Sequence, residues 1–152
     1  MDVTYINPFV AAIIGVFKSI SNQELEIGAL RLKGAKKTGF SISGVIGLSG
    51  NARGFIAISY PKTLAIKMVT AFLGMEVDEF SPYVADGVGE ITNMVAGNAK
   101  QELADFRFEL SLPTVVVGVD HRIEGSSGAP VIVIPLKCEW GEFEMEVSII
   151  VP

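Results

Sequence analysis

The stretch that decides the fold is SPYVADGVGEITNMVAGNAKQELADF, residues Ser81 to Phe106. Ser81 followed by Pro82 predicts a helix start, because serine caps the first turn and proline loses nothing at the first helical position. At about 100° per residue, one arc of this helix collects apolar side chains. They are Val84, Val88, Ile91, Val95, Ala99 and Leu103. The stretch therefore predicts an amphipathic helix whose apolar stripe faces a core.

The opposite arc is polar, and we call it the polar ridge: Asp86, Glu90, Asn93, Gly97 and Gln101. A solvated helix face usually carries glutamate and lysine in pairs one turn apart, which this ridge does not. The helix also contains three internal glycines, each costing about 1 kcal/mol relative to alanine. On spacing alone, an ordinary solvated face is the alternative. We interpret the ridge as a working surface to which another molecule comes close.

The composition describes an acidic chain with a substantial core. Its 152 residues are 49% hydrophobic and 19% charged, and we expect a single domain over residues 1–152. A domain of this length buries roughly 70% of its unfolded surface. The net charge of −5 argues against binding to nucleic acid or to an anionic membrane. The one cysteine, Cys138, allows no internal disulfide and suits the cytoplasm. The longest apolar run, residues 9–17, is too short to span a bilayer, and we expect no signal peptide.

The rest of the chain predicts two more helices and an antiparallel sheet. One helix is expected to begin at Asn7–Pro8, and another covers residues 62–73 before Gly74. Alternating apolar and polar residues predict strands over 24–32, 38–48, 53–60, 108–118, 131–140 and 142–151. Pro113 marks an edge, a bulge or a break in its strand. This order predicts a mixed α/β (α+β) fold, with a mainly antiparallel sheet and helices packed on one side.

The helix motif resembles a known family. GEITNMVAGNAKQEL, with Asp86 four residues before Glu90 and the SLP segment Ser111 to Pro113 downstream, resembles the CheX/CheC/FliY group of chemotaxis phosphatases. These proteins carry an acid-x3-Glu-x2-Asn motif on a helix. The resemblance covers most of the chain. Residues 62–73 hold no second Glu-x2-Asn, which favours the CheX branch with a CheC-like fold.

The resemblance implies a phosphatase that acts on the phosphoaspartate of a CheY-like response regulator. The motif helix would dock beside the phosphorylation site of the partner, where Asn93 would orient the attacking water. Glu90 would pair with the lysine near the phosphoaspartate. The remaining partner-contact positions would be Asp86, Gly89, Gly97 and Gln101.

The resemblance also bears on cofactors and assembly. No cofactor of the protein's own is implied, and Mg²⁺ is expected on the partner regulator. Relatives of this group are homodimers joined through their sheets, and the long closing strands after residue 130 could supply the sheet edge for such a contact. The rival interpretation is a non-catalytic binding domain of the same fold, for example a flagellar-switch-like scaffold. A metal-dependent hydrolase is the third class.

Other polar residues suggest less. The role of Asp86 stays open between capping, solvation and steering, and Asn98 is expected to make a buried hydrogen bond. His121 lies in a loop-like segment and is expected to be solvated, without a nucleophile beside it. The Gly125–Gly128 segment (GSSG) lacks the context of a phosphate-binding loop. Three glutamates alternate along the last strand, which indicates half-buried patterning more than a metal site. They are Glu142, Glu144 and Glu146.

Overall fold

The protein is described by a computed structural model that covers residues 3–34, 40–79, 81–119, 121–124 and 129–151. The helices are α1 (Val3–Ser21), α2 (Lys62–Leu73) and α3 (Pro82–Glu102). The strands are β1 (Glu26–Ile27), β2 (Arg31–Leu32), β3 (Ile42–Gly50), β4 (Arg53–Tyr60), β5 (Phe108–Leu110), β6 (Thr114–Val117), β7 (Ile132–Cys138) and β8 (Gly141–Ile150).

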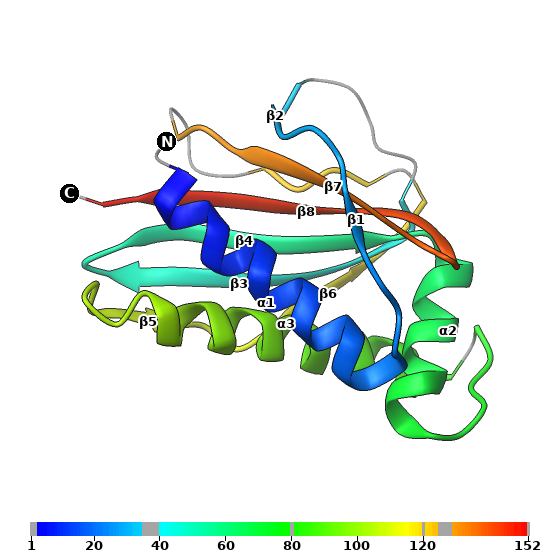
Figure 1. Ribbon diagram of the computed structural model, residues 1–152. Coiled ribbons are helices and arrows are strands. Elements are labelled where there is room, and N and C mark those ends of the chain that lie inside the picture. Colours follow the sequence, from blue (N-terminus) through cyan, green and yellow to red (C-terminus); the bar gives the residue numbers. More distant parts are fainter. Residues whose placement is uncertain (1–2, 35–39, 80, 120, 125–128, 152) are drawn as a thin grey trace.

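All the strands join one antiparallel sheet in the order β1-β7-β8-β4-β3-β5, with β2 paired to β7 and β6 paired to β3. Figure 1 shows α1 and α3 on the same face of this sheet, with α2 at one end. The predicted mixed α+β fold, with an antiparallel sheet and helices on one side, is therefore confirmed.

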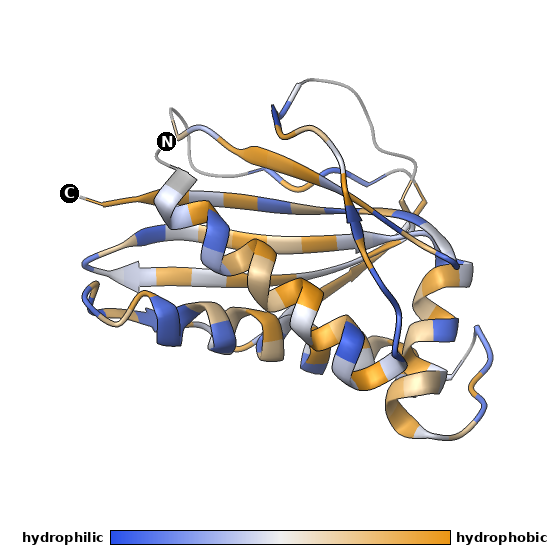
Figure 2. Ribbon diagram, in the orientation of Figure 1, coloured by the Kyte–Doolittle hydropathy of each residue, from blue (hydrophilic) through white to orange (hydrophobic). Residues whose placement is uncertain are grey.

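The core lies between the helices and the sheet face that they cover. One cluster of buried side chains contains residues from all three helices and from β3, β4, β7 and β8. Within it, the ring of Phe143 on β8 stacks on Phe17 of α1 at 4.9 Å and on Tyr60 of β4 at 5.3 Å. Figure 2 shows why this layer forms: hydrophobic residues alternate along the strands and recur along each helix. Burial of these residues supplies the main driving force for the fold.

Local signals set the ends of α2 and the start of α3. The side chain of Ser81 accepts a hydrogen bond from the amide of Tyr83 at 3.2 Å, as expected of an N-cap. Gly74 ends α2 with φ 69°, a left-handed conformation that suits glycine. The predicted range of α2 is confirmed. α3 ends at Glu102, four residues before Phe106, because the amide of Leu103 donates to the carbonyl of Lys100, three residues back instead of four.

The predicted start of α1 was wrong. The helix begins at Val3, so Pro8 lies inside it, in its second turn, where it lacks the N–H that would bond to residue 4. By length and composition alone, the window Thr4–Ser21 could cross a membrane. Its apolar side is nevertheless part of the core: Phe9, Ile13 and Phe17 are fully buried.

The sheet edges also differ from the prediction. The strand expected over 24–32 is two short pieces, β1 and β2. The stretch 108–118 is broken at Pro113 into β5 and β6, which is one of the outcomes that the proline predicted. The closing strands β7 and β8 lie inside the sheet, between β1 and β4, so they cannot supply the edge for a second copy. Within the described residues, one border of the sheet is formed by β5 and β6 and the other by β1 and β2.

Candidate functional site

Small residues fix α3 against its neighbours. Gly44 of β3 lies under α3, and a Cβ at this position would stand 2.1 Å from Oγ1 of Thr92. The Thr92 hydroxyl is buried but satisfied, because it donates to the carbonyl of Val88 at 2.8 Å. At Gly87, a Cβ would come within 2.8 Å of both methyl groups of Val69 on α2. α3 is therefore held closely on two sides, and its rotation about its own axis is restricted.

The predicted apolar stripe of α3 is buried, and the polar ridge is not. The side chains of Asp86, Glu90, Asn93 and Gln101 are all exposed. Within the described part of the chain, no hydrogen bond or ion pair holds the side chain of Asp86, Glu90 or Asn93. Asn93 follows Glu90 by three residues, so both side chains project from the same side of the helix, about one turn apart. A carboxylate and a carboxamide are thus presented to solvent, free to bind another molecule.

The glycines of the ridge region have different surroundings. Gly97 is open, with no atom within 4 Å of the place where a Cβ would stand. Gly89 is buried, and its missing Cβ would contact Val115 at 3.4 Å and Pro113 at 3.6 Å. The assignment of Gly89 to the partner-contact surface is therefore contradicted, since the chain's own β5–β6 connection covers it. Gly87, likewise, serves helix packing and not an approaching partner.

Two grooves border the C-terminal half of the ridge. One lies between α1 and α3, where Asn7, Ala11 and Gly15 face Asn98 and Gln101. The other is lined by Gly97, Lys100, Gln101, Ala104 and residues 106–109. Asn98 is exposed in the first groove, so the expectation of a buried hydrogen bond was wrong. Asn98 stands between the apolar and the polar arc of α3, so the helical period did not predict whether its side chain is buried or exposed.

His121 is not the solvated loop residue that the sequence predicted. Its ring is half-buried: Nδ1 lies 2.7 Å from the carbonyl oxygen of Gly118, and Nε2 lies 2.5 Å from the hydroxyl of Ser43. The carbonyl can only accept, so Nδ1 donates to it, and in the neutral ring Nε2 then accepts from Ser43. The Ser43 hydroxyl also lies 2.6 Å from that of Ser59, its cross-strand neighbour. Both serines are buried, so this chain of hydrogen bonds fastens a loop to the sheet and exposes no nucleophile.

Two of the three alternating glutamates of β8 take part in ion pairs. Glu144 pairs with Arg31 at 2.8 Å, and Glu146 pairs with Lys33 at 2.8 Å. Burial raises the pKa of the Glu146 carboxyl, and the hydrogen bond from Lys33 partly opposes that rise. Among the residues that the structure describes, no three His, Cys, Asp or Glu side chains gather as a metal site would require.

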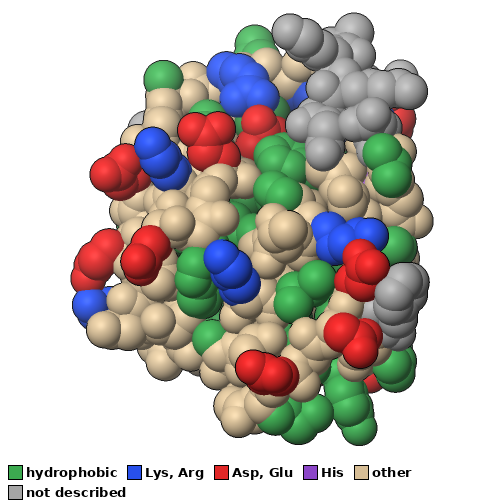
Figure 3. Space-filling view, turned by 90° about the vertical axis from the view of Figure 1, so that its right-hand side faces the viewer, with side chains coloured by type: hydrophobic (Ala, Val, Ile, Leu, Met, Phe, Trp, Pro, Cys, Tyr) green, Lys and Arg blue, Asp and Glu red, His purple; other side chains and the backbone are tan. Residues whose placement is uncertain are grey.

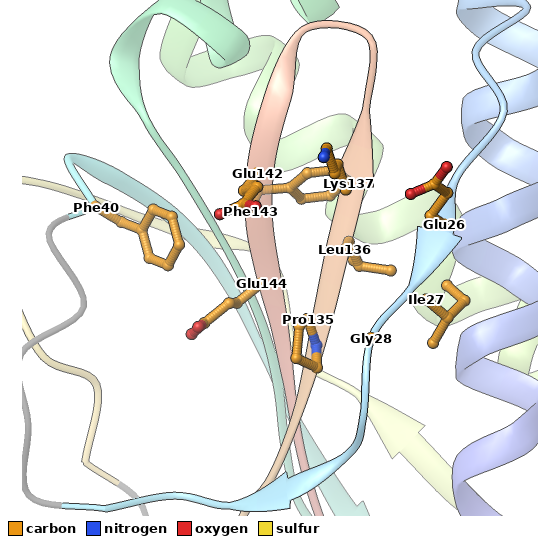
Figure 4. Close-up of a pocket in the computed structure, with 10 residues that line it drawn as sticks. All are labelled: Glu26, Ile27, Gly28, Phe40, Pro135, Leu136, Lys137, Glu142, Phe143 and Glu144. Atoms are coloured by element: carbon orange, nitrogen blue, oxygen red, sulfur yellow. The ribbon is translucent and has the colours of Figure 1, made fainter.

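A further hollow lies on the other side of the sheet, between β1 and the β7–β8 hairpin (Figure 4). Figure 4 shows the carboxylate of Glu144 between Phe40 and Pro135, with Glu142 and Lys137 nearer the hairpin turn. Arg31 of β2 already binds Oε1 of Glu144 at 2.8 Å, so the carboxylate in this hollow is engaged in an internal ion pair. Figure 3, a view onto the end beside α2, shows acidic, basic and hydrophobic side chains intermixed. Neither region gathers groups in the way that the ridge does.

Comparisons with known proteins point to one family. The family model described as "Chemotaxis phosphatase CheX" matches residues 42–137. The protein is 25% identical to the CheY-P phosphatase CheX of Thermotoga maritima, over 98% of this chain and 97% of that protein. Among solved structures, a CheC-like superfamily protein from Shewanella sp. PV-4 is 33% identical, with a TM-score of 0.91 and 99% of each chain covered.

A structure of a complex is also similar. It is the CheX–CheY–BeF3–Mg²⁺ complex from Borrelia burgdorferi, 25% identical with a TM-score of 0.82, covering 97% of this chain and 99% of that chain. The matched range of the family model includes the whole of α3 and thus the complete polar ridge. The sequence match, the fold and the exposed Glu90–Asn93 pair agree, and the chain belongs to the CheX family of chemotaxis phosphatases.

Proposed function

We infer that this protein dephosphorylates the phosphoaspartate of a CheY-like response regulator in bacterial chemotaxis or related two-component signalling. Its near-full-length similarity to a CheY-P phosphatase, and to a CheX bound to CheY, supports this activity. The observation that carries the inference is the outward presentation of Glu90 and Asn93 from a firmly packed helix. We propose that both side chains enter the active site of the regulator.

Asn93 would position the attacking water. Phosphoryl transfer needs little covalent help from a protein and depends mainly on alignment and on stabilisation of charge. A carboxamide offers a donor and an acceptor together, so it can orient a water without removing its proton. A glutamine plays this part in GTPases. The regulator would supply the Mg²⁺ and the lysine that stabilise the transferring phosphoryl group.

Glu90 would pair with that lysine and fix how the two proteins fit together. Asp86 and Gln101 extend the same exposed face in both directions along α3, and we assign them to partner contact. The whole stretch 1–152 would act as one phosphatase domain in the cytoplasm, where its buried thiol, Cys138, stays reduced. A homodimer remains part of the proposal, with the β1–β2 border as a sheet edge that a second copy could pair with while the β5–β6 border stays beside the ridge.

The decisive experiment measures phosphate release from a phosphorylated CheY-like regulator. We expect Asn93→Ala to lower turnover roughly a hundredfold while the protein folds normally, because the water loses its alignment. Glu90→Ala should mainly weaken binding. Asn98→Ala is the matched control: it removes an exposed amide from the same helix, but on a different side, and should leave turnover unchanged.

The rival interpretation, a scaffold without catalysis, gives a different result. In that case wild type, Asn93→Ala and Glu90→Ala would all release phosphate at the regulator's own rate. A metal-dependent hydrolase would instead bind divalent ions without any partner, which calorimetry on the isolated protein would detect.

A further inference from the structure

Leu112 is an apolar side chain with no cover from the described chain. It is 88% exposed, the largest exposed fraction among the large hydrophobic residues that the structure describes. A single exposed leucine is ordinary on a protein surface. This one is unusual because of where it lies and how its backbone is held.

The backbone at Leu112 is fixed to β3. The amide of Ser111 donates to the carbonyl of Gly47 at 2.9 Å, and the Ser111 hydroxyl accepts from the amide of Gly47 at 2.8 Å. The same hydroxyl donates to the carbonyl of Leu112 itself at 2.9 Å. Pro113 follows and restricts the next backbone angle. Leu112 is therefore presented in a defined position, which lowers the entropy lost when it binds something.

Leu112 lies beside the part of α3 between Gly89 and Lys100, which is the part that carries Asn93. The ring of Phe108 stands 5.9 Å from the Lys100 ammonium, and Pro113 lies against Gly89, so the β5–β6 segment runs antiparallel to the helix. Leu112 falls between these two contacts. Figure 1 shows α3 alongside this border of the sheet.

The same contact tells which flank of the ridge faces Leu112. Asn93 follows Gly89 by four residues, which turns it only about 40° from the direction in which Gly89 meets Pro113. Glu90 is turned about 100° from that direction. Asn93 is thus the nearer of the two, and Leu112 borders the ridge on the side of the amide.

We propose that Leu112 is an apolar anchor that packs against the phosphorylated response regulator next to its phosphoaspartate site. This inference rests on the proposed function and specifies how the same surface holds its partner. The ridge offers only exposed polar and charged groups, and such groups contribute little affinity in water. Burial of one leucine supplies what they lack, about ten- to a hundredfold in the dissociation constant.

The test measures binding and turnover separately. The probe is a purified CheY-like regulator loaded with beryllofluoride and Mg²⁺ for the dissociation constant, and the phosphorylated regulator for turnover. We expect Leu112→Ala to raise the dissociation constant about tenfold or more, with unchanged turnover at saturating regulator. Leu32→Ala is the matched control, because Leu32 is 67% exposed on β2, at the opposite border of the sheet.

Each outcome decides between the two proposals. An unchanged dissociation constant for Leu112→Ala, or a loss confined to turnover, overturns the anchor. Weaker self-association in sedimentation, with unchanged regulator binding, also overturns it and assigns Leu112 to a contact between copies. If Leu112→Ala weakens binding while Asn93→Ala keeps full phosphate release, the anchor stands and the catalytic proposal fails. A wild type that binds no loaded regulator rejects both.

Discussion

The glycines at positions 87, 89 and 97 of α3 differ in what surrounds them. At Gly87 a Cβ would come within 2.8 Å of Val69, so this glycine serves internal packing. At Gly89 a Cβ would make ordinary contacts with Val115 and Pro113, so this position is covered by the chain itself. At Gly97 nothing lies within 4 Å, and the fold gives no reason to accept the cost of glycine in a helix. A partner that approaches the helix backbone would give one. This makes Gly97 the glycine whose role the proposed docking explains.

Replacement of Gly97 should separate stability from binding. Gly97→Ala is expected to stabilise the protein by up to about 1 kcal/mol, measured by urea unfolding, because alanine favours the helix. Gly97→Gln should also fold well but should weaken binding of the beryllofluoride-loaded regulator. Gly15→Ala on α1, equally open, is the control for stability. If Gly97→Gln binds as tightly as wild type, Gly97 does not belong to the partner surface.

For individual residues, the sequence predicted the orientation of those side chains that depend only on the period of one helix. The helical period alone places Asp86, Glu90 and Asn93 on the exposed face, and the structure places them there. It could not predict the surroundings of His121, because Ser43 lies 78 residues away in the sequence. Nor could the helical period predict whether Asn98 is buried or exposed, because a small rotation of the helix changes one into the other.

Among the elements, those with strong local signals were predictable. α2 ends at a glycine with positive φ, α3 starts at a serine cap, and β3 and β4 join through a short polar turn. α1 was misplaced because Asn7–Pro8 imitates a helix start. β1 and β2 are each two residues long, and their existence depends on pairing with β7, about a hundred residues later. A local sequence pattern cannot predict such a pairing.

The seating of α3 on β3 is expected to depend on Gly44. In Gly44→Ala, the new Cβ would overlap Oγ1 of Thr92, so the helix must shift or the threonine must leave its rotamer. We expect a loss of about 1–3 kcal/mol in the free energy of unfolding, as for other overpacked cores. Phosphate release should fall as well, because the ridge moves with the helix. Urea unfolding and the turnover assay measure the two effects.

Gly47→Ala is the control for this substitution. Gly47 lies three residues further along β3, and a Cβ there would meet Ser111 at an ordinary 3.6 Å. This variant should keep its stability and its turnover. Equal losses in both variants would mean that the strand rejects any alanine, and that contact with α3 is not the reason for the glycine.

Across the whole molecule, ion pairs hold distant segments onto the sheet face that the helices leave open. Lys33, just after β2, pairs with Glu146 in the interior and also donates to the carbonyl of Ile123. Arg122 donates to the carbonyl of Gly34 at 2.6 Å. The sequence showed the alternation of the glutamates but not their partners, since Lys33 and Glu146 are 113 residues apart. Composition and pattern therefore predicted the covered face of the sheet better than the open one.

The buried Lys33–Glu146 pair should make stability depend on pH in a defined direction. Burial raises the pKa of Glu146 above its ordinary value of 4.5. Between 4.5 and the raised pKa, the unfolded chain loses a proton that the folded protein keeps, so the folded state loses stability as the pH rises. Glu146→Gln removes the titrating carboxyl and keeps a side chain of nearly the same shape. We expect the wild type's free energy of unfolding, relative to this variant, to fall by up to about 1.4 kcal/mol per pH unit across that window. Urea unfolding of both proteins from pH 4 to pH 7 measures it, and all other titrating groups are shared and cancel. A difference that grows with pH would show that Lys33, not burial, dominates at Glu146.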